Sequence, residues 1–290
     1  MAGLTQHWSA SWPILAGYLV LACAHLFGLW RLRAAGQPAA GSREQRQREA
    51  VLYQLGLLVV ALALVSPLGY LADRYIWVRM LQALLVTVVG PGLIVVGGPW
   101  DALTAAWSGR PVRRAALPQW LTGHAVLLAV VANAVWLAWQ VPLLFDRAEA
   151  SAGLALAEHV SYLAAGVVFW LQIVSSRPFR QQVPPLRRAA VVVGTVAAST
   201  VFGMMLVFGS GVLYPVYANS AHHVMSVLDD QQLAGAVWWM GILPPMIIAA
   251  VALMKEWLEN EESAELSAGL DRLLAPASRK RGWPSRTVIR

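Results

Sequence analysis

Seven apolar stretches, each about long enough to cross a bilayer, are the feature that most constrains this chain. They lie at approximately 12–30, 51–69, 77–98, 121–141, 157–174, 189–208 and 231–254. Each is close to the ~20 residues that span ~30 Å of hydrocarbon at a rise of about 1.5 Å per residue. The sequence therefore predicts an all-α, polytopic integral membrane protein. We expect a bundle of seven transmembrane helices over residues 1–254 and a cytoplasmic tail over 255–290.

The positively charged residues determine the expected orientation of these helices. Nineteen of the 22 Lys and Arg residues fall on one side of the seven stretches, and only Arg74, Arg79 and Arg147 fall on the other. Because Lys and Arg in short loops are retained on the cytoplasmic face, we expect the N-terminus outside and the C-terminus in the cytoplasm. The loops after the second, fourth and sixth stretches are then exoplasmic.

The net charge of +7 would suggest nucleic-acid binding in a soluble protein. Here the cations lie in the segments next to the apolar stretches, where they face anionic lipid head groups. We therefore expect no nucleic-acid partner. Within the third stretch, Gly90, Pro91 and Gly92 interrupt the helical pattern and predict a kink.

Ionisable and coordinating side chains gather at the exoplasmic ends of the stretches. Such groups are costly in hydrocarbon, so each one is a candidate functional residue as well as a candidate packing residue. They are Arg79, Met80, Gln140, Glu158, His159, Met204 and Met205, with His222, His223, Met225, Asp229 and Asp230 in the sixth loop. The expected orientation places all of them at one face of the membrane.

Some of these residues are of the types that bind copper. Imidazole binds both oxidation states of copper and thioether prefers Cu(I), so His159, His222, His223, Met204 and Met205 are the candidate metal ligands. Adjacent histidines, however, cannot share one helix face, and methionine in an apolar helix commonly fills packing gaps. The lone Cys23 offers no cysteine pair for a metal.

Arg79 has two interpretations from the sequence. Its guanidinium lies just inside the outer boundary and either reaches back to the lipid head groups or forms a buried ion pair with Asp73, Asp230 or Glu158. Gln140 similarly either caps its helix or donates a hydrogen bond across the bundle.

A haem- or quinone-binding membrane protein is a further alternative. Haem held by two axial histidines needs those residues to face each other across helices. His25 and His124, both toward the cytoplasmic side, are the only pair that the sequence offers for this role.

A series of short motifs runs through nearly the whole chain. They are Arg79-Met80-Leu81-Gln82-Ala83-Leu84-Leu85 leading into Gly90-Pro91-Gly92-Leu93 and Gly98-Pro99, Trp139-Gln140-Val141-Pro142, Glu158-His159, Phe169-Trp170, Leu213-Tyr214-Pro215, Tyr217-Ala218, and Asp230-Gln231-Gln232-Leu233-Ala234-Gly235 leading to Trp238. In these motifs the chain resembles the CtaG-type, or caa-type, cytochrome c oxidase assembly factors of bacterial membranes. The block that begins at Asp230 is the most specific of them.

The chain departs from that family at three positions. Members commonly begin the third helix with His-Met-x-x-His and end the fourth with Trp-His-x-Pro, whereas this chain has Arg79, Ala83 and Gln140 at the corresponding positions. If the family's histidines bind a metal, three ligands are absent here, and an arginine at one of them would repel a cation.

The resemblance implies a membrane-embedded assembly factor for a haem-copper cytochrome c oxidase, acting at the exoplasmic face of a bacterial plasma membrane and not an enzyme. Its expected partners are oxidase subunits or other assembly factors, and a copper chaperone or transporter is the alternative. We expect a functional cluster of Arg79, Gln140, His159 and Asp230, in which Arg79 takes the charge role of a metal. Whether copper is a cofactor stays open.

Overall fold

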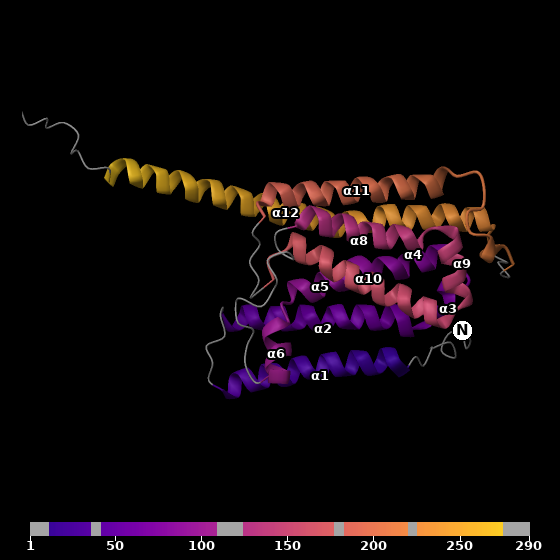
Figure 1. Cartoon of the computed structure of the whole chain (residues 1–290), viewed down its shortest axis with the longest axis horizontal. Coiled ribbons are helices and arrows are strands. Elements are labelled where there is room, and N and C mark those ends of the chain that lie inside the picture. The colour runs from indigo at the N-terminus through magenta and orange to yellow at the C-terminus, as the bar shows by residue number, and fades with distance from the viewer. Residues whose placement is uncertain (1–11, 36–41, 109–123, 177–182, 220–224, 275–290) are drawn as a thin grey trace, which may run out of the picture.

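The computed structural model describes residues 12–35, 42–108, 124–176, 183–219 and 225–274, and these residues form helices and connecting turns with no strand. The helices are α1 (Trp12–Ala34), α2 (Arg43–Val65), α3 (Pro67–Ala72), α4 (Ile76–Leu84), the π-helical turn η2 (Leu85–Val89), α5 (Gly90–Val96), α6 (Trp100–Ser108), α8 (Ala125–Trp139), α9 (Pro142–Ala150), α10 (Ala152–Ile173), α11 (Pro185–Phe208), the 3-10 turn η3 (Pro215–Asn219) and α12 (Val227–Leu274). The long helices lie side by side in a bundle (Figure 1).

Six of the described helical segments are long and apolar enough to cross a membrane, and the number is seven if the bent pair α8–α9 counts as one span. The chain is thus a multi-pass helical membrane protein by length and composition. In the fourth expected stretch, α8 ends at Trp139 and α9 starts at Pro142 after a bend of 67°. Proline suits the first turn of a helix because its missing N–H has no intrahelical acceptor there, so Pro142 begins α9 in a new direction.

The interruption expected at Gly90, Pro91 and Gly92 takes the form of a π-helical turn just before these residues. Pro91 lacks an N–H, so the helix cannot keep its regular hydrogen bonds through this point. The indole N–H of Trp170 in α10 donates to the carbonyl of Val88 at 2.8 Å. A side chain of a neighbouring helix therefore bonds a backbone carbonyl at the irregular turn, as a membrane interior requires.

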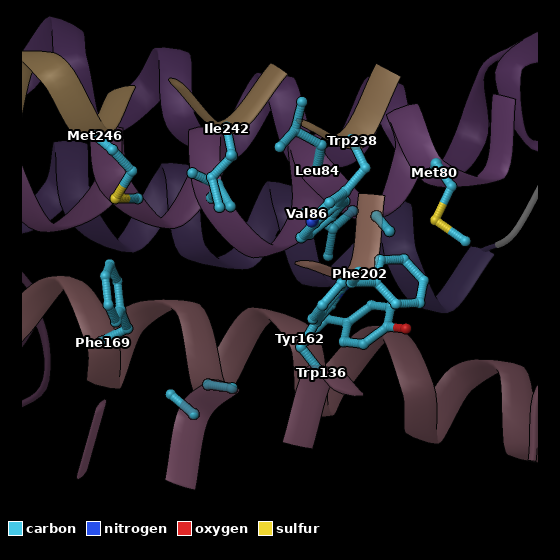
Figure 2. Packing of buried hydrophobic residues seen from close by; sticks show 14 of the residues in the cluster. Met80, Leu84, Val86, Trp136, Tyr162, Phe169, Phe202, Trp238, Ile242 and Met246 are labelled. Carbon is cyan, nitrogen blue, oxygen red and sulfur yellow. The ribbon is translucent and has the colours of Figure 1, made fainter. Parts of the chain in front are cut away.

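The core lies where α4, η2, α8, α10, α11 and α12 meet. Figure 2 shows Trp136, Phe202 and Trp238 packed close to one another. The rings of Trp136 and Trp238 stack with centroids 3.9 Å apart, and Phe202 meets Trp136 edge-on at 4.9 Å. Outward-facing apolar residues such as Val201 are largely exposed and offer a surface suited to lipid.

Glycines bring several helices into close contact. A Cβ built at Gly235 of α12 would lie 2.6 Å from the carbonyl oxygen of Gly203 in α11, and one at Gly166 of α10 would collide with the Thr87 carbonyl and Pro91. Small residues at helix contacts let backbones approach in a membrane, where packing replaces the hydrophobic drive for association.

Helix α12 is 48 residues long and contains Pro244 and Pro245. Its C-terminal part projects alone beyond the other helices (Figure 1). The tail expected from residue 255 therefore begins inside a helix that continues to Leu274. Where α12 leaves the bundle, Glu256 forms an ion pair with Arg188 at the start of α11, and Arg188 also donates to the carbonyl of Ile173 at 2.9 Å.

Candidate functional site

A buried ion network lies at the end of the bundle formed by α3, α9 and η3. At its centre is Arg79 in the first turns of α4, with only 8% of its surface exposed. One guanidinium nitrogen, Nη2, donates to Glu158 Oε2 at 2.8 Å, and Nη1 pairs with Glu149. The guanidinium also lies over the ring of Phe145, 4.5 Å from its centroid. We call Arg79, Glu149 and Glu158 the Arg79 network.

The bend between α8 and α9 brings one carboxylate of the network into place. Phe145 and Glu149 are four residues apart on α9, so both side chains lie on the same face of that helix. Glu158 comes from the second turn of α10 and is nearly fully buried. Two carboxylates thus surround one guanidinium, and charge-assisted hydrogen bonds to the cation offset part of the cost of burying all three charges.

Three buried tyrosines near the network form hydrogen bonds to Gln140 and Ala72. Gln140 Nε2 lies 3.1 Å from the hydroxyl of Tyr162, which comes four residues after Glu158 on α10. The Tyr214 hydroxyl donates to the Gln140 carbonyl at 3.1 Å, and the Tyr217 hydroxyl donates to the carbonyl of Ala72 at 2.7 Å. Burial raises the pKa of Tyr214 and of Tyr217 well above the ordinary value, so both phenols stay protonated and available as donors.

Asp230 has a different role from the one expected for an ion-pair partner of Arg79. It is fully buried in the first turn of α12 and accepts from the backbone N–H of Ile76 at 2.8 Å and of Trp77 at 3.0 Å. A carboxylate at a helix N-terminus bonds N–H groups that have no intrahelical partner and complements the helix dipole. Asp230 therefore fixes the start of the helix that carries Arg79.

The next residue, Gln231, holds the connection that precedes α12. The Leu213 N–H donates to Gln231 Oε1 at 2.6 Å, and Gln231 Nε2 donates to the Gly211 carbonyl at 3.0 Å. The Asp-Gln start of α12 thus binds both α4 and the segment that leads into Tyr214.

Of the four residues expected to form one cluster, Arg79 pairs with Glu158, and Gln140 bonds Tyr162 four residues further along α10. His159 is half-buried and directly follows Glu158 in α10. The ion-pair interpretation of Arg79 is confirmed for Glu158, and the interpretation in which its side chain reaches toward lipid head groups is wrong. Asp230 acts on the same helix through backbone atoms.

Three of the candidate copper ligands, His159, Met204 and Met205, lie in the part of the chain that the structure describes. Met204 and Met205 expose 39% and 52% of their surfaces on α11. His222 and His223 lie outside the described residues. Among the residues that the structure covers, no group of three or more His, Cys, Asp or Glu side chains has the arrangement of a metal site.

The histidines considered for haem or quinone have different surroundings. His25 is buried, its Nδ1 lies 3.2 Å from Gln54 Nε2, and its ring packs against Tyr53 with centroids 4.3 Å apart. His124 is exposed at the position before α8. His25 thus uses one ring nitrogen in a contact between α1 and α2.

Sequence reasoning missed Glu149, Phe145 and Tyr162. Residues 142–150 were expected to belong to a loop, whereas they form the amphipathic helix α9. The signal was available, because Pro142 begins the segment and Phe145, Ala148 and Glu149 recur at intervals of three and four residues.

Fold and site together define a multi-pass helical membrane protein with a buried ion network at one end of its bundle. The chain belongs to the cytochrome c oxidase caa3 assembly factor (Caa3_CtaG) family, whose model matches residues 23–260. It is also 23% identical over 273 residues to an uncharacterized protein of Mycobacterium leprae (strain TN). That match covers 88% of this chain and 40% of the relative, so the chain spans less than half the relative's length. No solved structure matches the chain significantly.

The family match agrees with the resemblance expected from the sequence motifs. It places the chain in a family described as cytochrome c oxidase assembly factors, and the apolar helices fit a multi-pass membrane protein.

Proposed function

We propose that this protein assists cytochrome c oxidase assembly as a metal-free scaffold that contacts oxidase subunits or other assembly factors at the exoplasmic end of its bundle. The observation that carries the proposal is the Arg79 network. A guanidinium between two carboxylates lies where the sequence resemblance expects a histidine of the family.

The Arg79 network holds one guanidinium between two carboxylates and needs no metal ion to do so. Arg79 is held on three sides, by Glu149 from α9, Glu158 from α10 and the ring of Phe145. Asp230 fixes the start of the helix on which Arg79 lies. These contacts give one rigid arrangement of α4, α9 and α10, and a surface for a partner subunit benefits from such preorganisation because little further ordering is needed on binding.

The distribution of cations supports the proposed orientation. Counted along the sequence, the segments on the side of the Arg79 network hold Arg74, Arg79 and Arg147, and the segments expected on the opposite side hold the other 19 Lys and Arg residues. By the positive-inside rule the network then faces the exoplasm of a bacterial plasma membrane, the side on which partner contact is proposed.

The test is complementation of a strain that lacks this gene, with assembled oxidase quantified from its haem absorbance in membranes. We expect Arg79→Ala to reduce assembled oxidase strongly, while Arg74→Ala, which removes a neighbouring exposed arginine, leaves it unchanged. We also expect His222→Ala to have little effect. Glu149→Gln keeps Arg79 paired with Glu158 and serves as a milder variant, should Arg79→Ala fail to accumulate. Wild-type oxidase levels with a folded Arg79→Ala protein would refute the proposal.

Copper delivery is the competing function, and copper content separates it from the metal-free scaffold. The purified protein is loaded with Cu(I), desalted and assayed for copper per chain, with His159→Ala in parallel. We expect no stoichiometric copper in either protein. Copper that is bound by the wild type and lost in His159→Ala would favour delivery instead. The combined variant Arg79→His, Ala83→His and Gln140→His, which restores the family's histidines, tests whether the assay detects copper on this fold.

A further inference from the structure

A second candidate site lies at the opposite end of the bundle from the Arg79 network, where α6 packs against the C-terminal part of α1 (Figure 1). The two helices are in close contact, because a Cβ built at Gly28 of α1 would collide with the carbonyl of Ala102 in α6. One turn further along α1, Arg31 Nη1 donates to the carbonyl of Ala106 near the end of α6, at 3.2 Å. A single arginine thus joins the two helix ends.

The guanidinium of Arg31 is oriented by the protein and keeps most of its hydrogen-bond donors. Its Cζ lies 5.6 Å from the centroid of the Phe27 ring, one turn earlier on α1. Arginine has five N–H donors, and the bond to Ala106 uses one of them. Within the described part of the chain, no carboxylate forms an ion pair with Arg31, which is half-buried. Its positive charge and its other donors therefore remain available to a ligand.

Exposed tryptophans come directly from the chain on both sides of this bond. Trp30, the residue before Arg31, is 61% exposed, and Trp107, the residue after Ala106, is 74% exposed. The Phe27 and Trp30 rings are stacked with centroids 5.7 Å apart. Tryptophan favours the depth of the lipid head groups, because its ring is apolar while its N–H needs a polar partner. The aromatic rings therefore indicate that this end of α1 and α6 lies at the membrane boundary.

The position of Arg31 along α1 agrees with that depth. α1 begins at Trp12, and at about 1.5 Å per residue Arg31 lies about 28 Å further along the helix axis. That length is close to the ~30 Å of hydrocarbon in a bilayer. The expected orientation places this end at the cytoplasmic leaflet, which carries anionic lipids. Among the groups of such lipids, the phosphate matches the fork of donors that a guanidinium presents.

We propose that Arg31, Trp30 and Trp107 form a binding site for an anionic phospholipid of the cytoplasmic leaflet. The lipid phosphate accepts hydrogen bonds from the N–H groups of Arg31 that Ala106 does not use, and the two indoles lie against the head group and the upper acyl chains. Because Arg31 is already held by Phe27 and Ala106, little side-chain freedom is lost when the lipid binds. The bound lipid would also reinforce the contact between α1 and α6.

The direct test is native mass spectrometry of the full chain in detergent, titrated with phosphatidylglycerol or with phosphatidylcholine. We expect tighter binding of phosphatidylglycerol, and no displacement of it by excess inorganic phosphate. Arg31→Gln should weaken phosphatidylglycerol binding by roughly tenfold or more, the factor that one hydrogen bond to a charged group contributes. The matched control Arg187→Gln, which removes an exposed cation at the start of α11, should bind like the wild type.

Three results would overturn the proposal: equal affinity for the two lipids, displacement by inorganic phosphate, or equal losses in Arg31→Gln and Arg187→Gln. The last of these would mean that lipid binds the basic end of the bundle without a defined site. If Arg31→Gln does not fold, the double variant Trp30→Ala, Trp107→Ala takes its place, because both rings are exposed and their removal should leave the fold intact. We expect it to lose affinity for phosphatidylglycerol, and wild-type affinity in the folded double variant would also overturn the proposal.

Discussion

Asp230→Asn tests whether α12 fixes the start of α4 through a single carboxylate. Asp230 accepts two backbone N–H bonds, from Ile76 at 2.8 Å and from Trp77 at 3.0 Å, with its two different oxygens. Asparagine has nearly the same size but only one acceptor oxygen, and its amide N–H₂ would face the second backbone donor. The variant therefore loses one hydrogen bond and the negative charge while the packing is kept.

The expected magnitude follows from the geometry. A hydrogen bond to a charged group contributes about 1.5–3 kcal/mol to the free energy of unfolding. That contribution is lost in full when the backbone donor stays buried without an acceptor. We expect Asp230→Asn to lower the free energy of unfolding by about 2–3 kcal/mol. For a chain of this size that corresponds to a fall in Tm of roughly 4–10 °C. Asp230→Ala leaves both N–H groups unpaired and should cost more.

The assay is thermal unfolding in detergent micelles. The transition is monitored by the intrinsic fluorescence of the chain's 14 tryptophans. Asp229→Asn is the matched control, because Asp229 is the adjacent acid and lies at an exposed position, where its carboxylate accepts from the Ser226 hydroxyl. We expect that control within about 0.5 kcal/mol of the wild type. Equal Tm values for Asp230→Asn and Asp229→Asn would refute the capping role.

Two further variants test the Arg188–Glu256 ion pair and the close contact of α10 with the π-helical turn. Glu256→Gln should lower the free energy of unfolding by up to about 3 kcal/mol, because Arg188 stays buried after its half-exposed partner loses its charge. The control Glu259→Gln, at a neighbouring exposed position, should cost under about 1 kcal/mol, and equal effects of the two variants on Tm would contradict this prediction. Gly166→Ala should destabilise by about 1–3 kcal/mol or more because its Cβ meets backbone of the π-helical turn. Gly194→Ala, where nothing lies within 4 Å, should be neutral or stabilising, and a tolerated Gly166→Ala would refute the close contact.

The helices themselves were largely predictable from the sequence, because runs of about 20 apolar residues have few alternatives in a membrane. Their ends were less so. The second helix starts at Arg43, eight residues before the apolar stretch, since its polar first turns are helical as well. The last helix continues to Leu274 because the acidic segment after residue 255 is rich in good helix formers such as Glu, Leu and Ala.

The site was predictable in part. Arg79, Gln140 and Glu158 stood out because polar side chains within apolar segments are rare and need partners. Glu149 did not, since a single acid beside Arg147 in a short polar connection has the pattern of an exposed loop residue. Its position depends on the 67° bend between α8 and α9, which hydropathy does not encode.

The length of α12 has a consequence for whatever approaches the carboxyl end of this chain. At about 1.5 Å per residue its 48 residues extend about 72 Å, more than twice the ~30 Å of hydrocarbon in a bilayer. The part beyond the Arg188–Glu256 ion pair accounts for about 27 Å of that length. The helix therefore acts as a rigid spacer, and a protein that binds near Leu274 would be held at a set distance from the bundle rather than against it.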